Sequence, residues 1–148
     1  MMHLDVGCEF ELRGDVNVDL AIPKFLFNKE FVNADAEYLP FKDDAFEEVT
    51  CFHVIEHVEN PYMLLRELLR VTKNKLIITC PYRFSGYAKS KQHKHYFSKS
   101  WFENELKKLN VALFKVAVVL DLERDILKFP LQIIVKIFKM RGHGERSG

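Results

Sequence analysis

The sequence predicts an α/β protein built on an open, mostly parallel sheet. Short apolar runs with a β-branched and aromatic bias, such as residues 49–52, alternate with helical patterns, the clearest of which spans residues 60–71. Polar residues also gather where strands are expected to end, as in residues 53–57. Ligands bind along this rim of an open parallel sheet, so the pattern predicts a binding site there.

Length and composition indicate one domain with a sizeable core. The chain has 148 residues, of which 48% are hydrophobic, and a net charge of +1 with a pI near 7.7. This charge gives no reason to expect a nucleic-acid-binding surface. No apolar run approaches the ~18 residues of a membrane span and no signal peptide is visible, so we expect a cytoplasmic protein without a membrane partner. We expect a single domain over residues 1–140 and a disordered tail over residues 141–148.

The three cysteines are expected to be reduced and packed. Cys8, Cys51 and Cys80 are odd in number and show no C-x-x-C spacing. A disulfide or a zinc site is therefore disfavoured relative to buried thiols in a cytosolic protein.

Strands are expected at seven places. The last of them, residues 131–139, is ambiguous, because as a helix it would show a polar stripe of Gln132, Lys136 and Lys139. Its β-branched composition favours a strand that pairs antiparallel with the preceding one. The expected strands are residues 3–6, 15–20, 31–34, 49–52, 75–79, 111–120 and 131–139.

Two helices carry recognisable start signals. Asn60 and Pro61 are a good N-cap and first helical residue for the helix that ends near Val71. Ser100 and Glu103 have the spacing of a capping box, which predicts a second helix beginning there.

Three segments occur in an order that is characteristic of a known family. They are the turn D-A-E-x-L-P-F-x-D-x-x-F from Asp35, the segment H-V-I-E-H-V-x-x-P from His53 and the strand end I-I-T-C-P at Pro81. Over about residues 4–109 the chain resembles the class I S-adenosylmethionine-dependent methyltransferases of the small-molecule type. The resemblance implies a Rossmann-like three-layer sandwich with a seven-stranded sheet of order 3-2-1-4-5-7-6. It also implies S-adenosyl-L-methionine as cofactor and methyl transfer to a small-molecule acceptor.

The link between the first two strands departs from this family. The family usually has D-x-G-C-G-x-G, whereas this chain has Asp5-Val6-Gly7-Cys8-Glu9-Phe10, which keeps only the first glycine. Only eight residues separate Val6 from Asp15, too few for a crossover helix but enough to span roughly 27 Å when extended. We therefore expect the first crossover helix to be missing. These departures favour an alternative function, a degenerate methyltransferase fold that serves as a non-catalytic binding or regulatory subunit.

The resemblance assigns the cofactor-binding residues. Asp19 matches the acid that binds the ribose hydroxyls, and a carboxylate can accept both hydroxyl hydrogen bonds. Asp35 and Ala36 match the adenine site, although Asp35 could also be an ordinary turn residue. The predicted set is Asp5, Gly7, Cys8, Glu9, Asp19, Leu20, Asp35, Ala36, Glu37, Phe52 and His53.

The residues that would contact the methyl acceptor are predicted less specifically than those that would bind the cofactor. His57, His95 and Tyr82 are the candidate catalytic residues, with His93 and Tyr87 of the loop at residues 82–97 as further substrate contacts. Each of them could equally be a solvated polar residue.

A metal site is not expected. Quinone-pathway O-methyltransferases and some RNA 2′-O-methyltransferases bind magnesium through a similar E-x-x-E-H segment. Here His53 replaces the first glutamate, and histidine is a poorer ligand for a hard ion.

The absence of the first crossover helix affects the expected oligomeric state. A parallel sheet needs both faces covered, and Phe10, Ile22 and residues 25–27 are left near the thinly covered face. They could fold over the sheet as a lid. Otherwise a second copy should bury them, which predicts a possible two-fold homodimer.

Overall fold

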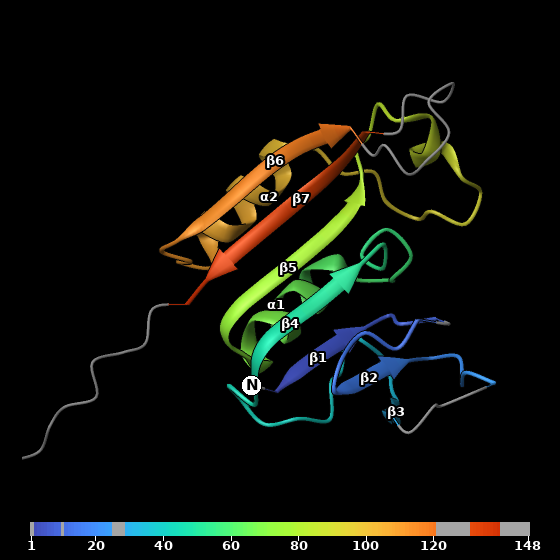
Figure 1. Cartoon of the computed structure of the whole chain (residues 1–148). Coiled ribbons are helices and arrows are strands. Elements are labelled where there is room, and N and C mark those ends of the chain that lie inside the picture. The colour runs from blue at the N-terminus through green and yellow to red at the C-terminus, as the bar shows by residue number, and fades with distance from the viewer. Residues whose placement is uncertain (1, 10, 25–28, 121–130, 140–148) are drawn as a thin grey trace, which may run out of the picture.

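A computed structural model describes residues 2–9, 11–24, 29–120 and 131–139. It contains one seven-stranded sheet of order β3-β2-β1-β4-β5-β7-β6, which is the order predicted from the sequence (Figure 1). The strands are β1 His3–Val6, β2 Val16–Asp19, β3 Glu30–Asn33, β4 Phe46–Phe52, β5 Thr72–Pro81, β6 Phe114–Leu120 and β7 Leu131–Phe138. The helices are α1 Pro61–Val71, α2 Lys99–Lys108 and the short 3₁₀ helix η1 Gly86–Lys89.

The sheet combines parallel and antiparallel strand pairings, as predicted. β1 to β5 are joined by parallel pairings, whereas β7 lies between β5 and β6 and pairs antiparallel with both. The choice of a strand for the ambiguous segment at residues 131–139 is confirmed. Neither α-helix is long and apolar enough to cross a membrane, and the described residues contain no other α-helix.

The core lies on one face of the sheet. Leu4, Val49, Leu76 and Ile137 are register partners across four strands, so their side chains share a face, and all are fully buried. Both α-helices lie on one side of the sheet (Figure 1). They add Leu64, Leu65, Leu68, Phe102 and Leu106 to the same core.

The opposite face is notably polar where β1, β4 and β5 meet. The hydroxyl of Thr50 donates to a carboxylate oxygen of Asp5 at 2.7 Å and lies 2.8 Å from Nε2 of His3. Beside them, Lys75 forms an ion pair with Glu48 at 3.1 Å. No α-helix among the described residues covers this face (Figure 1). Strands β1 and β4 therefore alternate between apolar and polar side chains, rather than being apolar on both sides.

The link from β1 to β2 contains no helix in its described residues, as predicted. Gly14 lets the link pass close to the sheet, because a Cβ atom there would lie 2.4 Å from the carbonyl oxygen of Val16 and 2.8 Å from the nitrogen of Asp5. The buried side chain of Asn17 holds the turn by bonding both the nitrogen and the oxygen of Gly14. The predicted tail at residues 141–148, Phe10 and residues 25–27 lie outside the described residues.

The helix starts agree with the sequence in one case only. Asn60 caps α1 as predicted, because its side-chain oxygen accepts hydrogen bonds from the nitrogens of Tyr62 and Met63. The capping box at Ser100 is wrong. Helix α2 begins at Lys99, and its N-cap is Ser98, whose hydroxyl accepts from the nitrogen of Trp101.

The start of β6 was placed too early. The strand begins at Phe114 rather than at residue 111. Asn110 has a φ of 55°, and the nitrogen of Val111 donates back to the carbonyl of Leu106. These residues therefore belong to the C-terminal cap of α2.

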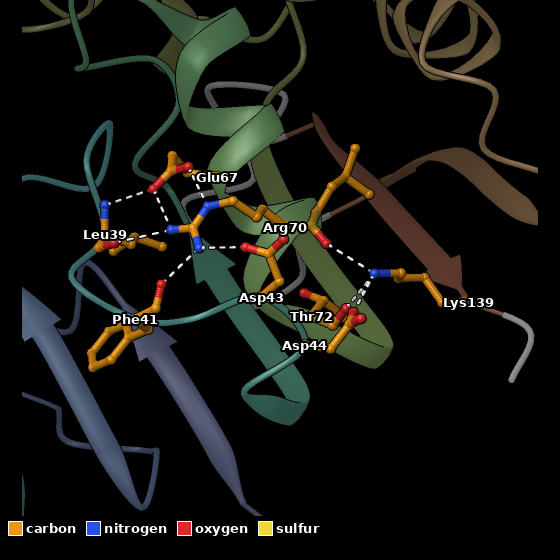
Figure 2. Close-up of polar contacts among 9 residues, drawn as sticks. Leu39, Phe41, Asp43, Asp44, Glu67, Arg70, Thr72 and Lys139 are labelled. Carbon is orange, nitrogen blue, oxygen red and sulfur yellow. Dashed lines mark hydrogen bonds and ion pairs between the residues drawn. The ribbon is translucent and has the colours of Figure 1, made fainter. Parts of the chain in front are cut away.

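Two basic side chains tie the C-terminal end of α1 to the loop before β4 (Figure 2). Arg70 donates to the carbonyls of Leu39 and Phe41 and forms ion pairs with Asp43 and Glu67. Lys139 donates to the carbonyls of Leu69 and Thr72 and binds Asp44 at 2.6 Å. This network fixes the path of the chain just beyond the predicted adenine-binding turn.

Candidate active site

A pocket of about 780 Å³ lies at the carboxyl ends of β1 to β4. Its size suits a small-molecule site, and its place at the strand ends agrees with the general rule for open α/β sheets. The predicted cofactor-binding residues that line it are Gly7, Cys8, Glu9, Asp19, Leu20, Asp35, Ala36, Glu37, Phe52 and His53.

Gly7, the one glycine of the family pattern that this link keeps, is sterically required. Gly7 has a φ of 75°, and a Cβ atom there would lie 2.0 Å from a methyl carbon of Val54. Glu9 also has a positive φ, 44°, which costs a non-glycine residue of order 1 kcal/mol. Its side chain is exposed at the pocket wall. The loop therefore keeps the turn at Gly7 although the later glycines of the family pattern are absent.

Asp19 is held in position by backbone donors. Its Oδ2 accepts from the nitrogen of Glu9 at 2.8 Å, and its Oδ1 accepts from the nitrogen of Ala21 at 2.9 Å. Each carboxylate oxygen can accept a second hydrogen bond, and the residue lines the pocket. The Asp19 side chain is thus pre-oriented to bind a pair of hydroxyl groups.

Asp35 and Glu37 share the next turn but are arranged differently. Asp35 is exposed, and its Oδ1 accepts only the local turn bond from the nitrogen of Glu37 at 2.9 Å. Glu37 is buried, and its Oε1 accepts from the nitrogens of Glu59 and Asn60 at 2.7 and 3.0 Å. Glu37 therefore fastens this turn to the segment that leads into α1, while Asp35 remains open to a ligand.

Asp5 does not line the pocket, unlike the other predicted cofactor-binding residues. It is 1% exposed, and Thr50 donates to its Oδ1 while Oδ2 accepts no hydrogen bond from the described residues. Burial raises the pKa of its carboxyl group, an effect opposed by the Thr50 hydrogen bond and by Arg13, 3.7 Å away.

Arg13 lines the pocket and was missed by the sequence reasoning. Its guanidinium group lies 5.5 Å from the ring centroid of Phe52 and forms an exposed ion pair with Glu11. The placement depends on how the short link folds back beside β1 and β4. The only signal in the sequence was the brevity of that link.

The wall beyond β4 is formed by the H-V-I-E-H segment and by residues 92–94. His53 takes a φ of 56°, and the nitrogens of Lys94 and His95 donate to the carbonyl of Glu56 at 2.8 and 3.3 Å. Among the predicted acceptor-side residues, His57 and His93 both reach the pocket.

His95 and Tyr82, the other two candidate catalytic residues, do not line this pocket. Nε2 of His95 lies 2.9 Å from the carbonyl of Val58, and the residue lines a neighbouring pocket of about 390 Å³ with Trp101. The ring of Tyr82 packs edge-on against Phe84. The side chain of Tyr87 lies outside the described residues.

The cysteines are unpaired and buried, as predicted. Burial, with Asp19 and Asp5 nearby, raises the pKa of the Cys8 thiol to about 11. Burial raises the pKa values of Cys51 and Cys80 as well. All three are therefore neutral thiols near pH 7.

Comparisons with known sequences point to one kind of protein. Residues 15–79 match the family model described as a methyltransferase domain. An uncharacterized protein of Methanocaldococcus jannaschii is 37% identical over 82 residues, which are 49% of this chain and 36% of that protein. The demethylmenaquinone methyltransferase of Clavibacter sepedonicus is 52% identical over 44 residues, 30% of this chain and 18% of that enzyme. The chain thus matches about a third or less of the length of these curated relatives.

Comparison with solved structures extends the likeness to nearly the whole chain. A protein of Thermotoga maritima, titled a SAM-dependent methyltransferase and possible histamine N-methyltransferase, superposes with a TM-score of 0.69 at 18% identity. The superposition covers 94% of this chain and 82% of that one. The fold is that of the class I S-adenosylmethionine-dependent methyltransferases. This chain has that fold, and its residues 15–79 match a methyltransferase-domain sequence.

S-adenosyl-L-methionine is the cofactor that this class implies, and the pocket residues fit it. Asp19 offers both carboxylate oxygens for ribose hydroxyls, and Asp35 is open at the end of the next strand. Gly7 provides the close turn after β1, and Arg13 adds a cation to the pocket lining.

Proposed function

We propose that this chain transfers a methyl group from S-adenosylmethionine to a small-molecule acceptor in the cytoplasm. The observation that carries the proposal is the pairing of Asp19 and Asp35 at the ends of neighbouring strands in one pocket. The three unpaired cysteines suit a reducing compartment.

The strand order gives the cofactor a direction across the sheet. Asp35 follows β3 and Asp19 ends β2, so the adenosine would lie at this end of the pocket. The methionyl group would then lie beside β1 and β4, where Arg13 is placed. Among the described Lys and Arg residues, only Arg13 and Lys94 line the pocket, and Lys94 is paired with Glu59. We assign Arg13 to the methionyl carboxylate, which would replace the exposed Glu11 as its partner.

When bound, the cofactor would supply an electrophilic methyl group on a sulfonium, which an acceptor lone pair could take while the carbon–sulfur electron pair remains on sulfur. The protein's task is then to position the acceptor and to exclude water. Nδ1 of His57 is 3.1 Å from the carbonyl of Gln92, which can only accept. Nε2 of His57 therefore presents a lone pair to the acceptor side, where it can take a proton or bind a cation.

The test is formation of S-adenosylhomocysteine from S-adenosylmethionine with a panel of phenols, amines, thiols and carboxylates. We expect turnover with at least one acceptor class, and at sub-saturating cofactor a loss of at least about tenfold in Asp19→Ala. Cofactor binding without turnover on any acceptor would instead support a non-catalytic binding or regulatory subunit.

A further inference from the structure

Three side chains with metal-binding atoms converge on the acceptor side of the pocket. Glu56 and His57 come from the segment after β4, and His93 comes from the loop after η1. One ligand atom from each lies within 4.8 Å of the other two, and all three residues line the pocket. Neither the fold nor the proposed transfer of a methyl group makes use of the Glu56 carboxylate.

The Glu56 carboxylate is buried without a hydrogen-bond donor among the described residues. The residue is 2% exposed, and neither of its carboxylate oxygens accepts a hydrogen bond from that part of the chain. The nearby basic atoms are Nδ1 of His53 at 3.4 Å and Nε2 of His57 at 4.0 Å. A buried carboxylate is costly unless it is paired or coordinates a metal. Its environment therefore calls for a cation.

Both histidines are oriented as metal ligands. Nδ1 of His57 lies 3.1 Å from the carbonyl of Gln92, and Nδ1 of His93 lies 3.0 Å from the carbonyl of Ala88. A carbonyl oxygen can only accept, so each Nδ1 carries the proton and each Nε2 keeps its lone pair. Such a bond from the outer nitrogen fixes the tautomer and the ring orientation of histidine ligands in metal sites.

The backbone holds the three ligands on a common frame. The nitrogens of Lys94 and His95 donate to the carbonyl of Glu56, which ties the loop carrying His93 to the segment carrying the other two. Neighbouring ligands of an ion with bonds near 2.1 Å are about 3–3.5 Å apart. The observed spacing of 4.0 Å between Glu56 and His57, and up to 4.8 Å within the group, is wider. The partly exposed histidines must therefore rotate toward Glu56 when an ion binds.

We propose that Glu56, His57 and His93 bind one divalent first-row transition ion in this pocket. Two imidazole nitrogens and one carboxylate suit ions such as Zn²⁺ or Mn²⁺ better than Mg²⁺. The sequence argument against a metal concerned a hard ion, and the donor set found in the structure selects a softer one. Three protein ligands leave an open coordination position. An acceptor oxygen would occupy that position, and this role, unlike the metal site itself, rests on the proposed function.

The first test is calorimetric titration of the chelator-treated chain with ZnCl₂ and with MnCl₂. We expect one Zn²⁺ per chain, bound at micromolar or lower dissociation constant, and at least about 30-fold weaker binding in Glu56→Gln and in His93→Ala. His95→Ala is the matched control, because it removes a histidine of the same loop that lies outside the pocket, and it should keep the wild-type affinity.

Thermal unfolding of the same samples guards against a folding defect. Without an ion, Glu56→Gln should unfold no earlier than the wild type, because it removes a buried carboxylate that accepts no hydrogen bond from the described residues. With Zn²⁺ the wild type should gain stability and the variant should not.

Three results would overturn the proposal: no stoichiometric Zn²⁺ or Mn²⁺ binding below about 100 μM, unchanged affinity in both ligand variants, or tighter binding of Mg²⁺ than of Zn²⁺. S-adenosylhomocysteine binding, measured in parallel, separates this proposal from the proposed function. If the homocysteine compound binds but the ions do not, only the metal proposal fails. If the ions bind but the compound does not, the metal proposal is supported and the methyltransferase proposal fails.

Discussion

At the scale of single residues, the pocket divides into side chains with oxygens open to a ligand and side chains that are bonded within the wall. Asp19 and Asp35 have carboxylate oxygens free for a second bond, whereas the buried Glu37 carboxylate binds the backbone of Glu59 and Asn60. The sequence predicted all three as cofactor-binding residues. The sequence could not show which carboxylates are open to a ligand and which one is structural. The burial and the hydrogen-bond partners of Glu37 depend on the segment at residues 59–60, which lies far away along the chain.

Arg13 offers a test of how the cofactor lies in the pocket. Arg13→Ala should weaken S-adenosylhomocysteine binding by at least about tenfold, because it removes a charge-assisted bond to the methionyl carboxylate. Binding of methylthioadenosine, which lacks that carboxylate, should be unchanged. Arg66→Ala, at an exposed position of α1, is the matched control in calorimetry. Equal losses for both ligands, or no loss for either, would contradict the assignment.

Cys8 lines the same pocket, and its reactivity tests whether its thiol is buried and neutral. With a pKa of about 11, only about 0.1% of the thiol is ionised at pH 8, and the thiolate is the form that reacts. We expect alkylation by iodoacetamide at pH 8 to be at least about 100-fold slower in the folded chain than in urea. Mass spectrometry of time points gives both rates. Rapid labelling of Cys8 in the folded protein would show that the thiol is neither buried nor held neutral.

At the scale of elements, most strands followed from local pattern, but several boundaries were wrong. Strands β4 and β5 begin at Phe46 and Thr72 rather than at residues 49 and 75, and helix caps displaced the predicted starts of α2 and β6. Runs of β-branched residues predicted strands at the positions of β5 and β7, and the structure has strands there. The start of α2 was misplaced because two serines, Ser98 and Ser100, could both cap the helix, and the burial of Phe97 and Phe102 decides between them. The polar network at the end of α1 had no signal in the sequence, since its partners lie far apart along the chain.

Arg70 is the test of that network. Arg70→Ala leaves the carbonyls of Leu39 and Phe41 without this donor and leaves the Glu67 carboxylate with only the nitrogen of Leu39, and we expect a loss of about 2 kcal/mol in unfolding free energy. Urea denaturation measures it, and Arg66→Ala should change the value by less than about 0.5 kcal/mol. A loss no larger than that of the control would show that the network is not needed for stability.

The effect of Arg70 should also depend on pH. Arg70 holds the pKa of Glu67 below its usual value, so the stability from this pair is present above the ordinary glutamate pKa and is lost as the pH falls through the lowered one. The difference between the wild type and Arg70→Ala should therefore shrink between about pH 5 and about pH 3. A difference that is constant over this range would show that the charge of Glu67 contributes nothing.

At the scale of the whole molecule, the sheet order and the missing crossover helix were both predicted, whereas the polar second face was not. The expectation of apolar side chains on both faces came from the general behaviour of parallel sheets. In β1 the residues alternate, so that Leu4 and Val6 enter the core while His3 and Asp5 face the other way. This alternation is visible in the sequence, but the prediction followed the general rule for parallel sheets instead.

The homodimer stays a prediction. Leu20 and Ile22, at the end of β2, are 71% and 70% exposed, which is compatible with a partner at this edge. We expect light scattering at micromolar concentration to give twice the chain mass of 17.4 kDa, and Ile22→Asp to give the monomer mass. A wild-type monomer under these conditions would contradict the prediction.

The central claim is that the pocket at the ends of β1 to β4 binds the methyl donor through Asp19. The direct measurement is calorimetric titration of the wild type and of Asp19→Ala with S-adenosylhomocysteine. The account predicts one site per chain in the wild type and at least about tenfold weaker binding in the variant. Absence of binding by the wild type at millimolar ligand, or equal affinities in the two proteins, would contradict it.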